Sequence, residues 1–139
     1  MFQAVVAVIP SCHIKYSYCN YLAVPRRDNT NLIGMVGGKV DGNESLIDAI
    51  KRECLEETGV EILDLVEIFK EKEFDYLTTT FLARSYKMPS VLSGDTGVPL
   101  FVSKDKLTDL AVCPFSEYNK KVFSIVDSLK LNDDYFLIL

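Results

Sequence analysis

The chain has 139 residues, which suits one compact domain over 1–139 and leaves little room for a second. Its 48% hydrophobic and 25% charged residues are typical of a globular protein and argue against a disordered or collagen-like chain. With 20 acidic against 15 basic residues, the net charge of −5 disfavours polymeric nucleic acid as a partner, although a small phosphorylated ligand stays compatible with a few local cations.

The first ten residues are apolar but carry no basic leader, and no apolar run reaches the ~20 residues that span a bilayer. We therefore expect a buried strand, a cytoplasmic protein and no membrane partner. The four cysteines, Cys12, Cys19, Cys54 and Cys113, include no Cys-x-x-Cys pair, which is typical of reduced thiols and disfavours a zinc site. His13 is the only histidine, so a Ser-His-Asp or Cys-His mechanism has little support.

Runs of β-branched and aromatic residues predict strands over 3–9 and 16–24, which could pair as a hairpin. A polar loop over 25–31 and a short apolar segment over 32–36 lead to a glycine-containing loop over 37–45. A helix is expected over 45–58. Its buried stripe would consist of Leu46, Ile47, Ile50 and Cys54, with Asn43 or Ser45 capping its start and Gly59 ending it in a left-handed conformation.

Strands are expected over 60–69 and 76–83, with the charged segment 70–73 at a solvated hairpin end. A flexible loop over 88–98, a short strand over 100–103 and an amphipathic helix over 116–131 complete the pattern, which favours one α/β domain with a mixed sheet. The apolar end 135–139 either pairs as an edge strand in a dimer or folds back on its own sheet. The choice between monomer and homodimer stays open.

Three carboxylates, Glu53, Glu56 and Glu57, fall on one arc of the expected helix because they are three and four residues apart. Such a density of hard oxygen ligands suits Mg²⁺ or Mn²⁺ better than zinc or copper. Arg52 lies beside Glu56 on the helical wheel and could fix a carboxylate with its planar guanidinium. The alternative is an ordinary solvated helix face with a minor ion pair between Arg52 and Glu56.

The stretch 38–60 decides between these readings, because it resembles the signature of the Nudix hydrolase family over all its fixed positions and both fixed gaps. These positions are Gly38, Glu44, Arg52, Glu53, Cys54, Glu56, Glu57, Gly59 and Val60. Cys54 is the single departure, since it stands in an aliphatic slot, and its small apolar side chain suits a core position.

The resemblance implies an α/β/α sandwich with a mixed sheet between helices, and an enzyme that hydrolyses pyrophosphate linkages of nucleotides. It implies that Glu53, Glu56 and Glu57, with the carbonyl of Gly38, bind Mg²⁺ (Mn²⁺ being possible for the family). Glu53 is the expected base for the attacking water and Arg52 the residue that orients it. Glu44 would brace the loop or share the role of base.

Six further residues are candidate substrate contacts, each with a structural alternative. Arg26, Arg27 and Lys39 could bind phosphate or be solvated surface cations. Tyr76 occupies a position associated in the family with dinucleoside polyphosphate hydrolases, but tyrosine also packs well at the start of a strand. Asp95 or Glu117 could supply a further carboxylate, although Asp95 also suits a turn. Phe101, Phe115 and Tyr118 could stack on a base or serve the core.

Three functional hypotheses follow for this chain. The first is a pyrophosphohydrolase of a nucleoside diphosphate linked to a group X, as in nucleoside triphosphates, ADP-ribose and dinucleoside polyphosphates. The second is a Nudix-like module that senses nucleotides without hydrolysing them. It predicts loss of residues from the signature stretch 38–60, the Nudix box, that are present here. The third, a structural or interaction domain, gives no reason for the spacing of Gly38 and Glu44. The sequence does not choose between substrates.

Overall fold

The structure is a computed structural model that describes residues 1–73, 75–129 and 137–138. Its centre is a mixed sheet whose strands lie in the order β4-β5-β1-β3-β2-β6. The strands are β1 (Phe2–Val8), β2 (Tyr21–Pro25), β3 (Ile33–Lys39), β4 (Glu61–Glu73), β5 (Tyr76–Lys87) and β6 (Leu100–Val102). Strands β1 and β5 run parallel, while the other neighbours in this order run antiparallel.

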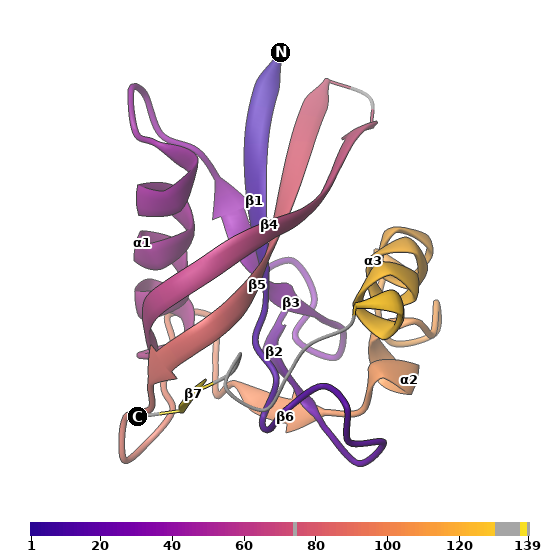
Figure 1. The fold of residues 1–139 in the computed structure, drawn as a ribbon. Helices are drawn as coiled ribbons and strands as arrows, with labels where there is room; N and C mark the ends of the chain where they lie inside the picture. Colours follow the sequence, from indigo (N-terminus) through magenta and orange to yellow (C-terminus); the bar gives the residue numbers. More distant parts are fainter. Residues whose placement is uncertain (74, 130–136, 139) are drawn as a thin grey trace.

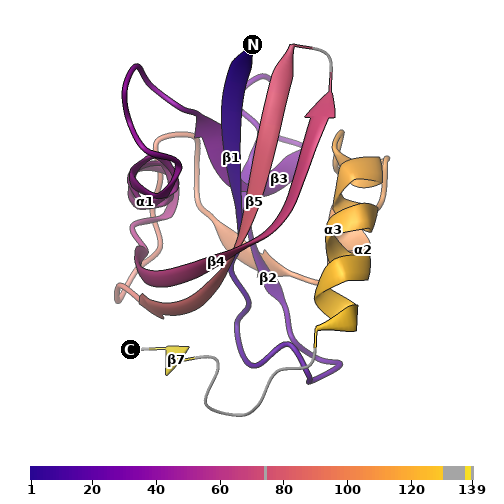
Figure 2. The same ribbon diagram turned by 45° about the horizontal axis from the view of Figure 1, so that its top comes forward.

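Helices cover both faces of the sheet, which confirms the expected α/β/α sandwich (Figures 1 and 2). Helix α1 (Leu46–Thr58) lies on one side, while α2 (Lys104–Leu107) and α3 (Ser116–Ser128) lie on the other. One apolar core joins α1 to the sheet around Ile50 and Cys54, and a second joins the sheet to α3 around Val122 and Phe123. Among the described residues, no helix combines the length and the apolar character that crossing a membrane requires.

The expected hairpin of the first two strands is wrong. Strand β1 lies in the middle of the sheet between β3 and β5, because its residues Val5, Ala7 and Val8 are fully buried and need cover on both sides. The second strand begins only at Tyr21, since 13–18 form turns. A single bridge, Pro10 with Tyr21, is what remains of the hairpin.

The glycine segment is part of a strand rather than a loop. Strand β3 continues through Gly37 and Gly38 to Lys39, with Gly37 opposite Val6 and Gly38 opposite Val5 of β1. Only the residues after Lys39 form the loop to α1. The glycines therefore lie at a rigid position in the sheet, a placement that matters for the site.

Helix α1 begins and ends as the sequence predicts. The N-cap residue is Ser45, whose Oγ accepts a hydrogen bond from the Asp48 amide (3.1 Å), and Gly59 ends the helix at a φ of 78°. Ile50 and Cys54 are buried as expected, but Ile47 is 38% exposed because Ala49 faces the sheet in its place.

The remaining elements differ from expectation mainly in length. Strand β4 runs on through the charged segment 70–73, which pairs with 76–79 of β5. Strand β5 extends to Lys87, and α2 was not expected. Helix α3 ends at Ser128, and residues 130–131 of the expected helix lie outside the described residues. Of 135–139, only β7 (Leu137–Ile138) is described, and it folds back to pair with β5.

Candidate active site

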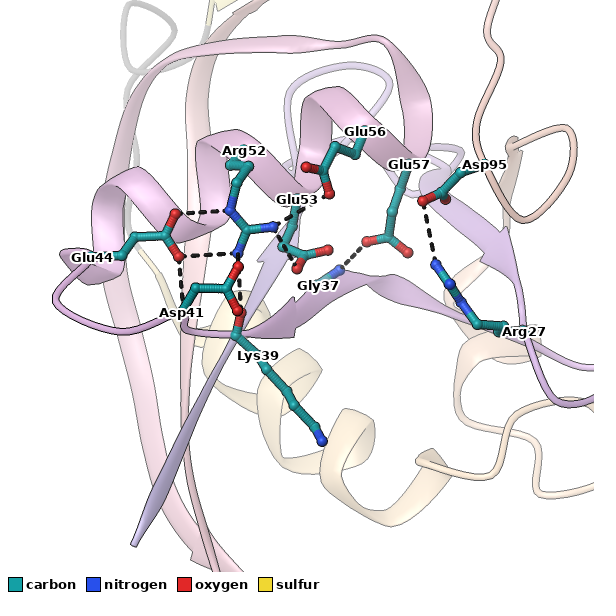
Figure 3. A network of polar contacts seen from close by, with 10 residues as sticks. All are labelled: Arg27, Gly37, Lys39, Asp41, Glu44, Arg52, Glu53, Glu56, Glu57 and Asp95. Carbon is teal, nitrogen blue, oxygen red and sulfur yellow. Dashed lines mark hydrogen bonds and ion pairs between the residues drawn. The ribbon is translucent and has the colours of Figure 1, made fainter.

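Arg52 is the centre of the polar network on α1 (Figure 3). Its Nε and Nη2 donate to the two carboxylate oxygens of Glu44 over 2.8 and 3.0 Å, in the bidentate geometry that gives arginine its rigidity. The same Glu44 carboxylate accepts the Asp41 amide at 3.0 Å. Together these bonds hold the pKa of Glu44 at about 2. Glu44 therefore braces the loop before α1 against the middle of the helix.

The other side of the guanidinium holds two carboxylates of α1. Arg52 Nη1 donates to Glu53 Oε1 at 3.0 Å and to Glu56 Oε2 at 3.3 Å, while Nη2 donates to the carbonyl of Lys39 at 3.2 Å. Asp41 adds an exposed ion pair at 3.3 Å. The i, i+4 pair of Arg52 and Glu56 exists, but it is only one of several contacts. The guanidinium therefore fixes the helix, the loop and strand β3 relative to each other.

Glu57 is oriented by the glycine strand instead of by Arg52. Its Oε1 accepts the Gly37 amide at 2.9 Å. Burial raises its pKa to about 8, helped by the negative charges of Glu53 and Asp95 and opposed by the Gly37 hydrogen bond. A carboxylate in this position gains from any positive charge that comes close to it.

Glu53 packs directly against the second glycine. A Cβ atom added at Gly38 would lie 2.5 Å from the carboxylate carbon of Glu53, so only glycine leaves space for this carboxylate. The side chain is 17% exposed, and burial raises its pKa above the usual range despite the neighbouring Arg52. Glu53 is thus a confined carboxylate with its Oε1 on Arg52.

The loop between β5 and β6 packs against the C-terminal end of α1. Gly94 lies so close to the helix that an added Cβ would be 1.8 Å from the carbonyl oxygen of Glu57. The next residue, Asp95, forms an ion pair with Arg27 at 3.3 Å. Asp95 and Arg27 therefore extend the row of charged groups beyond Glu57 (Figure 3).

A groove of about 610 Å³ is lined by residues of the sheet and of α3. Helix α3 covers the face of the sheet opposite α1 (Figure 2). The lining of the groove includes residues of β1, β3 and β5 together with Arg26, Tyr76, Phe115, Tyr118 and Asn119. Gly37 and Gly38 also line it. The same glycine backbone thus contacts the groove on one side and the carboxylates Glu57 and Glu53 on the other.

Most of the site residues predicted from the sequence come together around strand β3. Lys39 and Tyr76 meet at the groove, with the ammonium 5.8 Å from the ring centroid, and the Lys39 side chain points away from the carboxylates (Figure 3). Arg26 lies over the ring of Phe115 at 4.7 Å and pairs with Asp28.

Glu117 is not brought to the carboxylates, because α3 covers the other face of the sheet, and it pairs there with Lys120 at 2.9 Å. Phe101 packs against the α1 core and does not line the groove.

Three residues that contribute to the site were not predicted from the sequence. The Gly37 amide fixes Glu57, Asp41 joins the Arg52 network, and Asn119 lines the groove while its side-chain amide donates to the Leu107 carbonyl at 2.8 Å. Asp41 lies three residues before Glu44, which was a usable signal for a loop bond. The roles of Gly37 and Asn119 depend on contacts between distant segments, and no local pattern indicates them.

The carboxylate oxygens at this site are the type of ligand that binds a hard divalent cation. Among the described residues, no group of three or more acidic, histidine or cysteine side chains is arranged to hold a metal ion as it stands. The reason is that Glu53 and Glu56 are drawn to Arg52, while Glu57 is turned to Gly37. Their oxygens are nevertheless the ligands that Mg²⁺ prefers, and Glu57 is a partly buried carboxylate held by the neutral Gly37 amide.

Comparison with solved structures shows the same fold. The ORF135 protein of E. coli superposes with a TM-score of 0.73 at 17% identity, over 95% of each chain. A NUDIX hydrolase from Nitrosomonas europaea gives 0.69 at 23% identity, over 95% of this chain and 97% of the other. A MutT/nudix family protein from Enterococcus faecalis gives 0.60 at 24% identity over 72% of this chain, which spans only 42% of that protein.

At these identities the likeness concerns the fold, and the family follows from the sequence. Among curated proteins, none matches this chain. The family model described as the NUDIX domain matches residues 5–128, which include the whole box, the Arg52 network and most of the groove. The chain therefore belongs to the NUDIX family, and it is a hydrolase that acts on pyrophosphate bonds.

Proposed function

We propose that this hydrolase is a Mg²⁺-dependent pyrophosphohydrolase of a nucleoside diphosphate linked to a group X, such as a nucleoside triphosphate, ADP-ribose or a dinucleoside polyphosphate. One observation carries the proposal. The backbone of Gly37 and Gly38 lines the groove and also contacts the carboxylates of Glu57 and Glu53. A nucleoside in the groove would therefore have its phosphates beside the carboxylates of Glu53 and Glu57.

The groove suits one small ligand in size and in chemistry. Its volume of about 610 Å³ lies within the range of small-molecule sites. Phe115 and Tyr118 offer aromatic surface for a base, and Arg26 and Lys39 place positive charge at the lining. These cations give an acidic protein a local attraction for phosphate.

The metal ligands in this proposal are Glu53, Glu56, Glu57 and the carbonyl of Gly38. Bound Mg²⁺, or Mn²⁺, would neutralise the diphosphate and lower the pKa of a water molecule. Glu53 would accept the proton of the attacking water, and its raised pKa moves its proton affinity toward the range in which a general base works well. Arg52 would hold Glu53 in place from Nη1 while Glu44 holds Arg52.

Product release over a panel of nucleoside triphosphates, ADP-ribose, dinucleoside polyphosphates and NADH tests the proposal, with Mg²⁺ and with chelator. We expect turnover of at least one substrate that chelator abolishes. Glu57→Gln should remain folded and reduce turnover by orders of magnitude. Glu67→Gln is the matched control, because Glu67 lies on β4 and its contact is a 3.9 Å pair with Lys70.

Three outcomes would contradict the proposal. Activity that persists in chelator would exclude a required metal. Tight binding of a nucleotide without turnover on any member of the panel would instead favour a sensing module. Full activity of Glu57→Gln would show that the metal site is assigned to the wrong residues.

A further inference from the structure

The two ends of the loop that joins β1 to β2 run antiparallel and are hydrogen-bonded to each other. The Leu22 amide donates to the Ile9 carbonyl at 3.0 Å, and the Ser11 amide donates to the Asn20 carbonyl at 2.8 Å. Between these two bonds, Pro10 lies opposite Tyr21. Beyond this pair the Asn20 amide donates to Ser11 Oγ at 3.0 Å, and Cys12 and Cys19 are the next residues on the two sides.

The type of this pair matters for its chemistry. Pro10 and Tyr21 form a non-hydrogen-bonded pair, because the bonds flank them instead of joining them. Pair types alternate along an antiparallel ladder, so an extension of this ladder would put the next pair of this type at Cys12 and Cys19. In such pairs the Cα atoms are about 4.5 Å apart and the side chains are close, which falls within the ~4.4–6.8 Å that disulfides require.

Side-chain contacts agree with the register. Cys19 Sγ donates to the Cys12 carbonyl at 3.2 Å and to the Asn20 carbonyl at 3.4 Å. Burial and a hydrogen bond with the Cys19 thiol raise the pKa of Cys12. Both are free thiols in the structure. Cys12 is partly exposed whereas Cys19 is 6% exposed, so Cys12 is the first to meet an oxidant.

We propose that Cys12 and Cys19 are a site of reversible oxidation to an intramolecular disulfide, with a peroxide as the oxidant. The Cys12 thiolate attacks one oxygen of hydrogen peroxide, which yields a sulfenic acid and, with one proton, a water molecule. Cys19 Sγ then attacks the Cys12 sulfur, the S–S bond forms, the S–O bond breaks and a second water leaves. Two thiols lose two electrons, and the peroxide is reduced to two waters.

The bond would fasten the base of a loop that lines a second cavity. This cavity of about 500 Å³ is bordered by 13–21, by Ser103–Asp105 and by the end of α3. The loop presents the stacked rings of Tyr16 and Tyr18, whose centroids are 5.2 Å apart. The residues of the box do not border the cavity, so oxidation is expected to act on this loop and on stability.

Peptide mapping of the full chain tests the proposal, because Lys15 lies between the two cysteines. The folded protein is treated with hydrogen peroxide at pH 8.5, where more of Cys12 is thiolate, then alkylated and cut with trypsin without reduction. We expect peptides 1–15 and 16–26 to be joined and to separate after dithiothreitol. The oxidised protein should melt about 5–10 °C higher, since the bond restricts the unfolded chain.

Variants define the pair. Cys12→Ser should give neither the joined peptides nor the increase in melting temperature, whereas Cys113→Ala should retain both. The proposal is overturned if the folded wild-type protein, verified by circular dichroism, shows Cys12 unmodified, oxidised beyond sulfenic acid, or joined to another cysteine. A disulfide between two chains, seen on a non-reducing gel, would overturn it equally.

Discussion

Replacement of Gly38 by alanine is the most direct test of the active-site geometry. The new Cβ would lie 2.5 Å from Cδ and Oε1 of Glu53 and 2.7 Å from Oε2. Ordinary contact begins at about 3.4 Å, so the carboxylate has to move by roughly 1 Å, and a displacement of this size costs about 10²-fold in rate at a reacting centre. We expect kcat to fall by about 10²-fold.

Gly34→Ala is the matched control, because Gly34 lies on the same strand and its added Cβ meets only Arg26 Cδ at 3.7 Å. Neither change should alter the free energy of unfolding by more than about 1 kcal/mol. The assay compares kcat and KM of both variants on the best substrate of the panel, with urea unfolding in parallel. If Gly38→Ala keeps kcat within about threefold of wild type while Gly34→Ala does the same, the position of Glu53 does not matter to the reaction.

Three further predictions concern stability and reactivity. The pKa of Glu44 lies at about 2, below its unfolded value near 4.5, so the ionised group stabilises the fold above pH 4.5 and this stabilisation is lost as the pH falls toward 2. Glu44→Gln should therefore lower the urea midpoint at pH 7, by an amount that shrinks at pH 3; an equal loss at both values would contradict the ion pair with Arg52. Gly94→Ala should destabilise the protein by about 1–3 kcal/mol, because its Cβ clashes with the Glu57 carbonyl, and an unchanged urea midpoint would refute that packing. Cys54 should resist iodoacetamide at pH 8 until denaturant is added, since burial raises its pKa to about 12; mass spectrometry that finds rapid labelling of the folded protein would contradict this.

The sequence was informative wherever the structure depends on neighbours along the chain. Helix α1 has the expected limits because Ser45 and Gly59 supply local hydrogen bonding and backbone freedom at its ends. Arg52 and Glu56 meet because they are one helical turn apart. The spacing from Gly38 to Val60 was enough to identify the family.

The sequence was less informative where partners are distant. The hairpin of β1 and β2 was a reasonable expectation from two neighbouring β-rich runs, but β1 is buried in the centre of the sheet by β3 and β5. Local patterns do not encode strand order, because Val5 and Val8 could be buried between any two neighbouring strands. The inclusion of Gly37 and Gly38 in β3 was missed for the related reason that glycine has low intrinsic strand preference.

The sequence by itself determined the family, the acidic helix with its caps and the α/β class, because these follow from local spacing and periodicity. Only the tertiary structure decided which groups meet across long separations. Folding places the Gly37 amide on Glu57, Asp95 on Arg27, and the Cys19 thiol on the Cys12 carbonyl. Such contacts depend on the pairing register of strands and on the packing of loops, which the free energy of the whole domain sets.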